Sequence, residues 1–292
     1  MTESSAASSG VAGPGHEGYV LDAENAAEMA RLMIQDRLIT KAMGGVLPEQ
    51  SDLSQVHRVL DIACGPGGWL LEMVTQYPHL HGVGVDISQL MTAYAANLAA
   101  SQELSNIDFQ AMDVTQGLKF PDYSFDFVNG RILTGFLLTQ QWEALLQECA
   151  RITRPGGVLR LTEVEWGFTN SAALDILTEY TARAFYLSGH TFSPRGRTIG
   201  TSNVLRMLMR KAGYEQIEQH AHVVDFSAQT EAHDSNVQNV LVIYKMIQPF
   251  FLAMQVSTAE ELQELYTQLE QDMQKDDFCA VDYYLTVRGR KR

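Results

Sequence analysis

The stretch Val59-Leu60-Asp61-Ile62-Ala63-Cys64-Gly65-Pro66-Gly67-Gly68 decides how this chain folds. It begins as a short apolar strand and passes through a glycine-rich turn. It then enters a helix whose apolar residues recur on one face until Pro78. Because glycine has no Cβ, such a turn can bend sharply and lie directly against a ligand. Strand, glycine-rich turn and helix in this order are typical of the opening unit of a nucleotide-binding α/β domain.

The spacing around this turn narrows the class of ligand. A dinucleotide fingerprint would need a third glycine where the chain has Leu70, and a phosphate-binding P-loop would need a Lys-Ser or Lys-Thr pair after the turn. An acidic residue, Asp86, ends the next predicted strand, roughly 20 residues after the turn. This distance suits a carboxylate that accepts hydrogen bonds from a ribose diol.

Four motifs in this order resemble those of the class I S-adenosylmethionine-dependent methyltransferases. Asp61-x-Ala63-x-Gly65-x-Gly67 resembles motif I, with Ala63 where a glycine is usual, and Asp86 matches the ribose acid. Met112-Asp113-Val114 resembles the adenine-binding motif, and Arg154-Pro155-Gly156-Gly157 resembles the turn into the fifth strand. The resemblance covers roughly residues 57–165 and is closest to the small-molecule branch that includes quinone-biosynthesis enzymes.

The resemblance implies S-adenosyl-L-methionine as cofactor and S-adenosyl-L-homocysteine as product. It assigns cofactor contacts to Tyr19, Arg37, Asp61, Ala63, Gly65, Gly67, Asp86, Ile87, Met112, Asp113, Val114, Asn129, Gly130 and Arg131. Ligands of open α/β sheets lie beyond the carboxyl ends of the strands, where most of these residues fall. The alternative for a strand-end carboxylate is a structural role, in which it accepts backbone N–H groups. For Tyr19 and Arg37 the alternative is a helix that only packs on the sheet.

The pattern of elements predicts an α/β fold. Strands expected at 57–61, 81–86, 107–111, 125–129 and 158–163 alternate with helices, which favours a parallel sheet with right-handed crossovers. The family resemblance completes a Rossmann-like, seven-stranded, mostly parallel sheet with helices on both faces, an antiparallel last strand and helical lid insertions. The two last strands are expected at 214–226 and 278–288.

The predicted organisation has three parts. Residues 1–17, rich in Ser, Ala and Gly, are expected to form a disordered tail, and 18–50 an N-terminal helical cap. In that cap, Ala26, Met29, Ala30, Met33, Ile34 and Leu38 are expected on one helix face, and Gly44-Gly45 at the helix end. Residues 51–292 form the methyltransferase domain, with lid insertions at about 166–200 and 230–256.

Composition limits the partners and the compartment. The chain has 292 residues and 46% are hydrophobic, which is enough for a sizeable core. A net charge of −14 argues against a nucleic-acid substrate. Three cysteines without regular spacing argue against disulfides and zinc sites and fit a cytoplasmic protein. We expect no membrane partner, a small-molecule acceptor, and a monomer or homodimer.

The predicted reaction is methyl transfer to O, N or C of a small apolar or aromatic metabolite. Such a transfer depends mainly on alignment, and it needs a base only if the acceptor keeps its proton at working pH. Candidate bases are His190, Glu163 and Tyr19, although a lid histidine can equally be a hydrogen-bonding residue. No magnesium site is expected. One alternative is an enzyme of this fold that uses the cofactor for a cyclisation or rearrangement. Another is a non-catalytic binding subunit.

Overall fold

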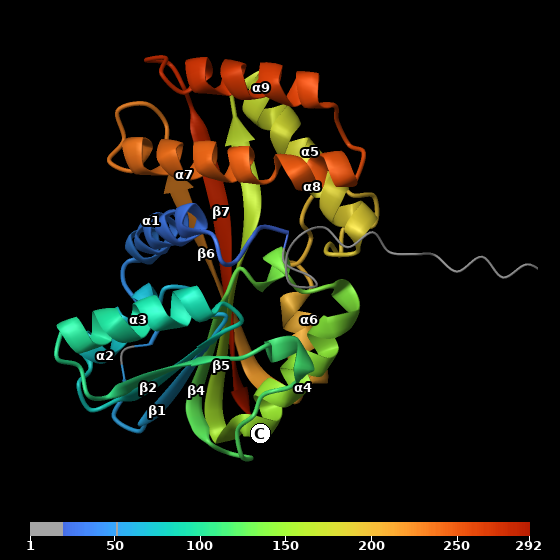
Figure 1. Ribbon diagram of the computed structural model, residues 1–292. Coiled ribbons are helices and arrows are strands. Elements are labelled where there is room, and N and C mark those ends of the chain that lie inside the picture. Colours follow the sequence, from blue (N-terminus) through green and yellow to red (C-terminus); the bar gives the residue numbers. More distant parts are fainter. Residues whose placement is uncertain (1–19, 51) are drawn as a thin grey trace, which may run out of the picture.

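The computed structural model describes residues 20–50 and 52–292, so Tyr19 and the predicted tail at 1–17 lie outside the described residues. Seven strands form one sheet in the order β3-β2-β1-β4-β5-β7-β6 (Figure 1). The strands are β1 (Arg58–Ile62), β2 (His81–Asp86), β3 (Ile107–Ala111), β4 (Phe125–Arg131), β5 (Thr153–Thr169), β6 (Tyr214–Asp225) and β7 (Ala280–Lys291).

The sheet has the predicted topology. Strands β1 to β5 pair in parallel, whereas β7 lies antiparallel between β5 and β6. Central strands are buried on both faces, as β1 and β2 show, because helices cover the two sides. The prediction of a Rossmann-like, mostly parallel sheet with an antiparallel last strand is therefore confirmed.

Helices enclose both faces of the sheet. Figure 1 shows α2 and α3 on one side of the strands and α4 and α6 on the other. On the first side Trp69 of α2 stacks on Phe127, with 6.4 Å between the ring centroids. On the second side Trp142, Leu145 and Leu146 of α4 are buried against the sheet. The bounds are α2 (Gly68–Gln76), α3 (Gln89–Ser101), α4 (Trp142–Ile152) and α6 (Leu205–Lys211).

Strands β5 and β7 continue well beyond the carboxyl edge of the parallel sheet. The sequence predicts a fifth strand of 158–163, but β5 (Thr153–Thr169) runs to Thr169 because β7 pairs with it from Val158 onward, as far as the pair Thr169–Ala280. The pairing shifts register between Glu165 and Phe168. There, a Cβ on Gly167 would lie 1.8 Å from the Val281 carbonyl oxygen, so only glycine allows this close approach.

The cap is the group of helices that surrounds these strand extensions. It consists of α5 (Ala172–Ser188), α7 (His233–Met246), α8 (Gln248–Ala253) and α9 (Ala259–Asp272). Its own apolar core contains Leu177, Phe251 and Leu269. Helix α9 lies beyond the second predicted insertion, which was expected to end at about residue 256. The division of the chain into lid and domain stays a prediction.

Helix α1 (Ala26–Met43) lies between the sheet and the cap and contacts α7. It ends at Gly44 as predicted, but the expected apolar face is wrong: Ala26 and Ala30 are exposed, and the buried residues include Glu28, Arg31 and Ile39. The physical reason is that α1 has partners on two sides, so tertiary packing rather than a single apolar stripe sets its rotation. No helix among the described residues is long and apolar enough to cross a membrane.

Candidate cofactor and acceptor site

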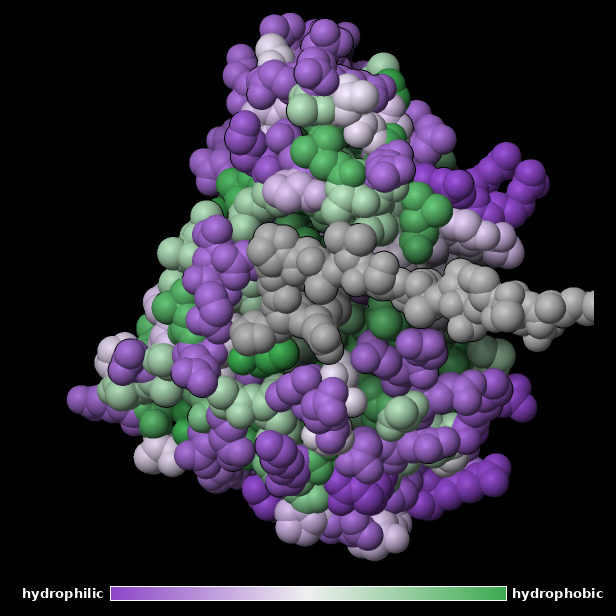
Figure 2. All heavy atoms as spheres, turned by 45° about the vertical axis from the view of Figure 1, so that its right-hand side comes forward, coloured by the Kyte–Doolittle hydropathy of each residue, from purple (hydrophilic) through white to green (hydrophobic). Residues whose placement is uncertain are grey.

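One pocket, with a cavity volume of about 240 Å³, runs from the strand ends into the cap. Its lower part, the strand-end part, is lined by the turns after β1, β2, β3 and β4 and by α1. Its upper part, the cap chamber, is lined by residues that include Leu174, Thr178, Val240, Tyr244 and Asp282. On the face seen in Figure 2, hydrophobic residues gather at mid-height, between more hydrophilic upper and lower ends.

The turn after β1 contains residues with positive φ angles. Ala63 has a φ of 53° and lines the pocket, together with Gly65. A left-handed backbone conformation costs a residue with a Cβ roughly 1–2 kcal/mol. Ala63 therefore carries strain that a glycine, the usual residue at this position, would not. Gly67 is not a pocket-lining residue. A Cβ there would lie 2.7 Å from the Phe109 ring, so Gly67 lets α2 pack closely on the sheet.

Asp86 joins the turns after β1 and β2. Its Oδ2 accepts the Gly65 N–H at 2.8 Å and its Oδ1 accepts the Ser88 N–H at 3.0 Å. Burial raises the pKa of Asp86, while these backbone donors oppose the rise. Asp86 also lines the pocket. The Asp86 carboxylate therefore holds the two turns in place and also faces the pocket, so the structural and the ligand-binding interpretations are compatible.

The turns after β2 and β3 supply an apolar slot with one carboxylate. Ile87, Met112, Asp113 and Val114 all line the pocket. The Asp113 carboxylate is fixed by Thr115, which donates its backbone N–H at 2.9 Å and its hydroxyl at 2.7 Å to Oδ1. The four residues that the sequence assigned to an adenine site are thus neighbours in the pocket.

Asp61 lies at the other end of the strand-end part. It lines the pocket, and its Oδ1 accepts the Asn129 side-chain N–H at 2.8 Å. Burial raises the pKa of Asp61 to about 7, partly offset by Arg131. Asn129 and Gly130 do not line the pocket, because Asn129 is buried between Asp61 and Arg160 and a Cβ on Gly130 would lie 2.8 Å from Ile62.

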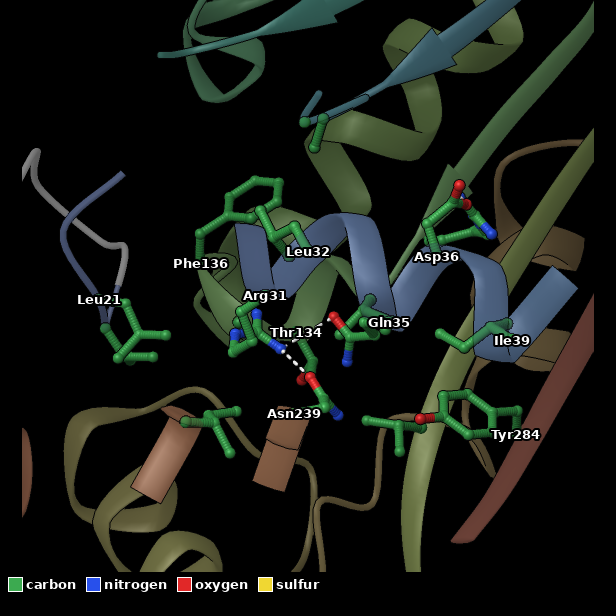
Figure 3. Close-up of a pocket in the computed structure, with 18 of the residues that line it drawn as sticks. Leu21, Arg31, Leu32, Gln35, Asp36, Ile39, Thr134, Phe136, Asn239 and Tyr284 are labelled. Atoms are coloured by element: carbon green, nitrogen blue, oxygen red, sulfur yellow. Dashed lines mark hydrogen bonds and ion pairs between the residues drawn. The ribbon is translucent and has the colours of Figure 1, made fainter. Parts of the chain in front are cut away.

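Helix α1 closes this end with residues that the sequence did not single out. Asp36 forms an ion pair with Arg131, and both line the pocket with Leu32 and Gln35. Figure 3 shows Leu32, Gln35, Asp36 and Ile39 projecting from α1. Arg37 is exposed and does not line the pocket. The helical spacing of residues 31, 32, 35, 36 and 39 is the signal that could have identified this face.

The residues predicted as candidate bases do not line the pocket together. Glu163 is fully buried outside the pocket, and its Oε1 accepts the Leu133 N–H at 2.7 Å. Burial raises the pKa of Glu163 to about 8. His190 is also buried outside the pocket lining, with Nδ1 2.8 Å from the Ser188 hydroxyl and its ring 5.5 Å from that of Phe185. Tyr19 lies outside the described residues.

The cap chamber combines apolar walls with a few polar groups. Phe185, Phe226 and Ile247 line it and belong to the core of the cap. Within residues 20–50 and 52–292 there is no group of three His, Cys, Asp or Glu residues that could hold a metal ion. The site therefore offers shape and hydrogen bonds to a small molecule next to a nucleoside-sized slot.

Comparisons with known proteins agree with this geometry. Residues 59–157 match the family model described as a methyltransferase domain. The secondary metabolism regulator laeA of Coprinopsis cinerea is 25% identical over 178 residues, which are 58% of this chain and 42% of that protein. Demethylmenaquinone methyltransferase of Deinococcus radiodurans is 36% identical over 107 residues, 37% of this chain and 43% of that protein. The chain spans about half or less of the curated relatives it matches.

A solved structure shows the same fold. Phosphoethanolamine N-methyltransferase 2 of Haemonchus contortus, in complex with phosphomonomethylethanolamine and S-adenosylhomocysteine, superposes with a TM-score of 0.54. It is 17% identical, and the match covers 94% of this chain and 60% of that one. The chain contains a class I S-adenosylmethionine-dependent methyltransferase domain. S-adenosylmethionine is the cofactor of this domain, and the similarity to demethylmenaquinone methyltransferase is consistent with the predicted branch.

The strand-end part of the pocket fits this cofactor. Asp86 offers a carboxylate that can accept hydrogen bonds from a diol, and Ile87, Met112 and Val114 offer apolar surface beside Asp113. Asp61, Asp36 and Arg131 place charges of both signs at the opposite end, which suits an amino acid moiety that also carries both charges.

Proposed function

We propose that the protein transfers a methyl group from S-adenosylmethionine to O, N or C of a small apolar or aromatic molecule held in the cap chamber. One observation carries the proposal: the slot lined by Asp86 and Asp113 and the chamber lined by Val240 and Tyr244 are parts of the same pocket. An acceptor in the chamber would face the methionine end of the cofactor without crossing solvent.

We assign cofactor binding to the predicted residues that line the pocket, and add Asp36. These residues are Asp61, Ala63, Gly65, Asp86, Ile87, Met112, Asp113, Val114 and Arg131. Gly67, Asn129 and Gly130 would act indirectly, through packing and through the hydrogen bond from Asn129 to Asp61. Tyr19 stays a prediction, and the exposed position of Arg37 does not favour a contact.

The chain's contribution to the reaction is alignment and exclusion of water. The bound cofactor supplies an electrophilic methyl group on a sulfonium. Alignment of two reactants in a closed site can lower a barrier by about 7–11 kcal/mol. The buried positions of Glu163 and His190 favour structural roles for both, so the proposed reaction relies on an acceptor that is nucleophilic without a base from these residues.

The first test is a calorimetric titration of the protein with S-adenosylmethionine and S-adenosylhomocysteine, followed by an acceptor screen. Both should bind, and turnover should produce S-adenosylhomocysteine together with an acceptor heavier by one methyl group. Conversion of an acceptor without loss of S-adenosylmethionine would support the cyclisation or rearrangement alternative. Absence of binding by both compounds would leave a non-catalytic subunit.

The binding assignment is tested by Asp86→Ala. Hydrogen bonds to charged groups contribute about 1.5–3 kcal/mol, so affinity for both compounds should fall roughly 10- to 100-fold. Asp108→Ala is the matched control, because Asp108 is an exposed carboxylate on the adjacent strand β3, where its Oδ2 lies 3.4 Å from His81 Nε2 and away from the pocket. Equal affinities in the wild type and Asp86→Ala would refute the assignment.

A further inference from the structure

The polar groups of the cap chamber carry information about the acceptor, and this inference rests on the proposed function. We propose that the acceptor presents a hydrogen-bond donor, and no anionic group, on an apolar body, and that Asp282 is the residue that recognises this donor. The chamber's charges, the environment of Asp282 and its position along β7 lead to this proposal.

The cation of the chamber is already neutralised. Arg31 of α1 donates Nε–H and Nη2–H to the two carboxylate oxygens of Glu28, each at 2.7 Å. Its Nη1 donates to Gln35 Oε1 at 3.2 Å and to Asn239 Oδ1 at 3.0 Å, as the dashed lines of Figure 3 show. Both Arg31 and Glu28 are buried. A carboxylate or phosphate on the acceptor would therefore have to break a buried ion pair.

The same holds at the boundary with the cofactor slot. Among the described residues that line the pocket, Arg31 and Arg131 are the cations, and Arg131 is paired with Asp36. The relative of known structure binds a phosphate-bearing amine. Here Arg31 is paired with Glu28, and Arg131, paired with Asp36, is assigned to the amino acid end of the cofactor, so no described pocket-lining cation is left for an anionic acceptor, whose desolvation cost would not be offset.

Asp282 is an acidic group of the chamber that forms no ion pair with any residue of 20–50 or 52–292. It lies on β7 opposite Val224 and next to the register shift at Gly167. Its side chain is half-buried and lines the pocket. Burial raises the pKa of Asp282 to about 6, although Gly167 N–H and the Asn236 side chain favour the charged form. Asn236 of α7 is buried and faces Asp282 from the helix side, whereas Gly167 faces it from the neighbouring strand.

The neighbouring hydroxyls do not satisfy this carboxylate. Thr178 and Tyr244 bond to each other at 3.2 Å, and Thr181 donates to the Leu177 carbonyl oxygen at 2.8 Å. The remaining walls of the chamber are apolar, including Leu174 and Val240. An acceptor hydroxyl or ammonium that donates to Asp282 would replace the hydrogen bonds that its carboxylate loses on leaving water.

Asp282 is a specificity-determining residue rather than a base. Thr286 pairs with Thr162 at the carboxyl edge of the parallel sheet, and Asp282 lies four residues before Thr286 on the antiparallel β7, on the cap side of that edge. At about 3.3 Å per residue this places Asp282 about 13 Å beyond that edge. It would therefore hold the end of the acceptor that is remote from the transferred methyl group.

Four biphenyl probes of similar size test the proposal: 4-hydroxybiphenyl, 4-biphenylmethanamine, 4-methoxybiphenyl and biphenyl-4-carboxylate. Each is titrated by calorimetry into the protein saturated with S-adenosylhomocysteine. We expect the hydroxyl probe, the amine probe or both to bind at least tenfold more tightly than the ether and the carboxylate. The hydroxyl and amine arms distinguish a neutral donor from a cationic one.

The variants Asp282→Leu and Asp282→Asn then test the residue. Asp282→Leu should abolish the preference, whereas Asp282→Asn, which keeps an acceptor oxygen, should retain part of the preference for the hydroxyl probe. Asp234→Leu removes an exposed carboxylate from α7 and should change nothing. Unchanged affinity for S-adenosylhomocysteine in the variants shows that the fold and the cofactor site are intact.

Several outcomes would overturn the proposal. One such outcome is that the ether or the carboxylate binds as tightly as both donor probes. Another is that all four probes fail to bind. A third is that the preference for a donor persists in Asp282→Leu. Failure of the proposed function looks different, because S-adenosylhomocysteine itself would not bind. The probes can then still be titrated into the protein alone.

Discussion

Three carboxyl groups with raised pKa values, two of them buried and the third, Asp282, half-buried, distinguish this protein at the scale of single residues. Burial raises the pKa of Asp282 to about 6, of Asp61 to about 7 and of Glu163 to about 8. Asp61 and Asp282 line the pocket, whereas Glu163 accepts the backbone N–H groups of Leu133 and Thr134 behind it. Glu163 thus fixes the turn after β4, which carries Thr134 and Gly135 at the pocket wall.

Glu163 gives a prediction about stability and pH. The folded protein keeps a proton on Glu163 up to about pH 8, whereas the unfolded chain releases it near the ordinary value of 4.5. The folded state therefore binds more protons between these values, and its free energy of unfolding decreases as pH rises through this window. Glu163→Gln removes the titration and keeps an oxygen that can accept the Leu133 N–H.

Urea unfolding between about pH 5 and pH 8 measures this effect. Relative to Glu163→Gln, the wild type should lose on the order of a few kcal/mol across the window, since one pKa unit corresponds to about 1.4 kcal/mol. Asp61 and Asp282 titrate in both proteins and cancel in the difference. Parallel pH profiles for the two proteins would contradict the protonated state of Glu163.

At the scale of elements, helix α1 acts as a cover on the turn after β1. A Cβ on Gly68, the first residue of α2, would lie 2.1 Å from the Asp36 Oδ2 atom. Asp36 cannot retreat without loss of its ion pair to Arg131. The close approach of α1 to α2 thus depends on a glycine at position 68 and on the carboxylate opposite it.

A double-mutant cycle tests this contact. Gly68→Ala should push α1 away and weaken S-adenosylhomocysteine binding by about tenfold, the equivalent of about 1.4 kcal/mol. In an Asp36→Ala background the Cβ has room, so the additional effect of Gly68→Ala should be small. Additive effects in the calorimetric affinities would show that α1 does not rest on this turn.

At the scale of the whole molecule, two strands hold the sheet and the cap together. β5 and β7 pair from Val158 and Arg290 at the base of the sheet to Thr169 and Ala280 inside the cap. The cap core packs directly on these extensions, where the ring centroids of Trp166 and Phe185 lie 6.3 Å apart. An opening of the cap alone would therefore expose strands that the sheet still holds in place.

This continuity predicts one cooperative unfolding transition. Fluorescence of variants that keep only Trp166, near the cap, or only Trp69, in the sheet, should give the same Tm. S-adenosylhomocysteine at about 100 times its Kd should stabilise both by about 2.7 kcal/mol, because it binds only the folded state. Two separate transitions, or a shift confined to the Trp69 variant, would mean that the cap unfolds independently.

The sequence by itself determined the half of the molecule built from local motifs. Asp86, Ile87, Asp113 and the turn at Ala63 follow directly on strands whose apolar pattern is readable, and parallel strands bring their carboxyl ends to one edge. The topology and the place of the cofactor slot follow from that rule, without any knowledge of contacts between distant residues.

Only the tertiary structure decided which side chains face the pocket from elements without such a motif. The rotation of α1, which brings Asp36 rather than Arg37 to the site, results from simultaneous packing on the turn after β1 and on α7. Glu163 lies within the extended β5 and Asn129 within β4, and buried partners engage both: Glu163 accepts the Leu133 N–H, whereas Asn129 donates to Asp61 and accepts from Arg160. Asp282 of β7 and Tyr244 of α7 line the same chamber. The sequence could not predict this, because contacts between residues far apart in sequence leave no local pattern.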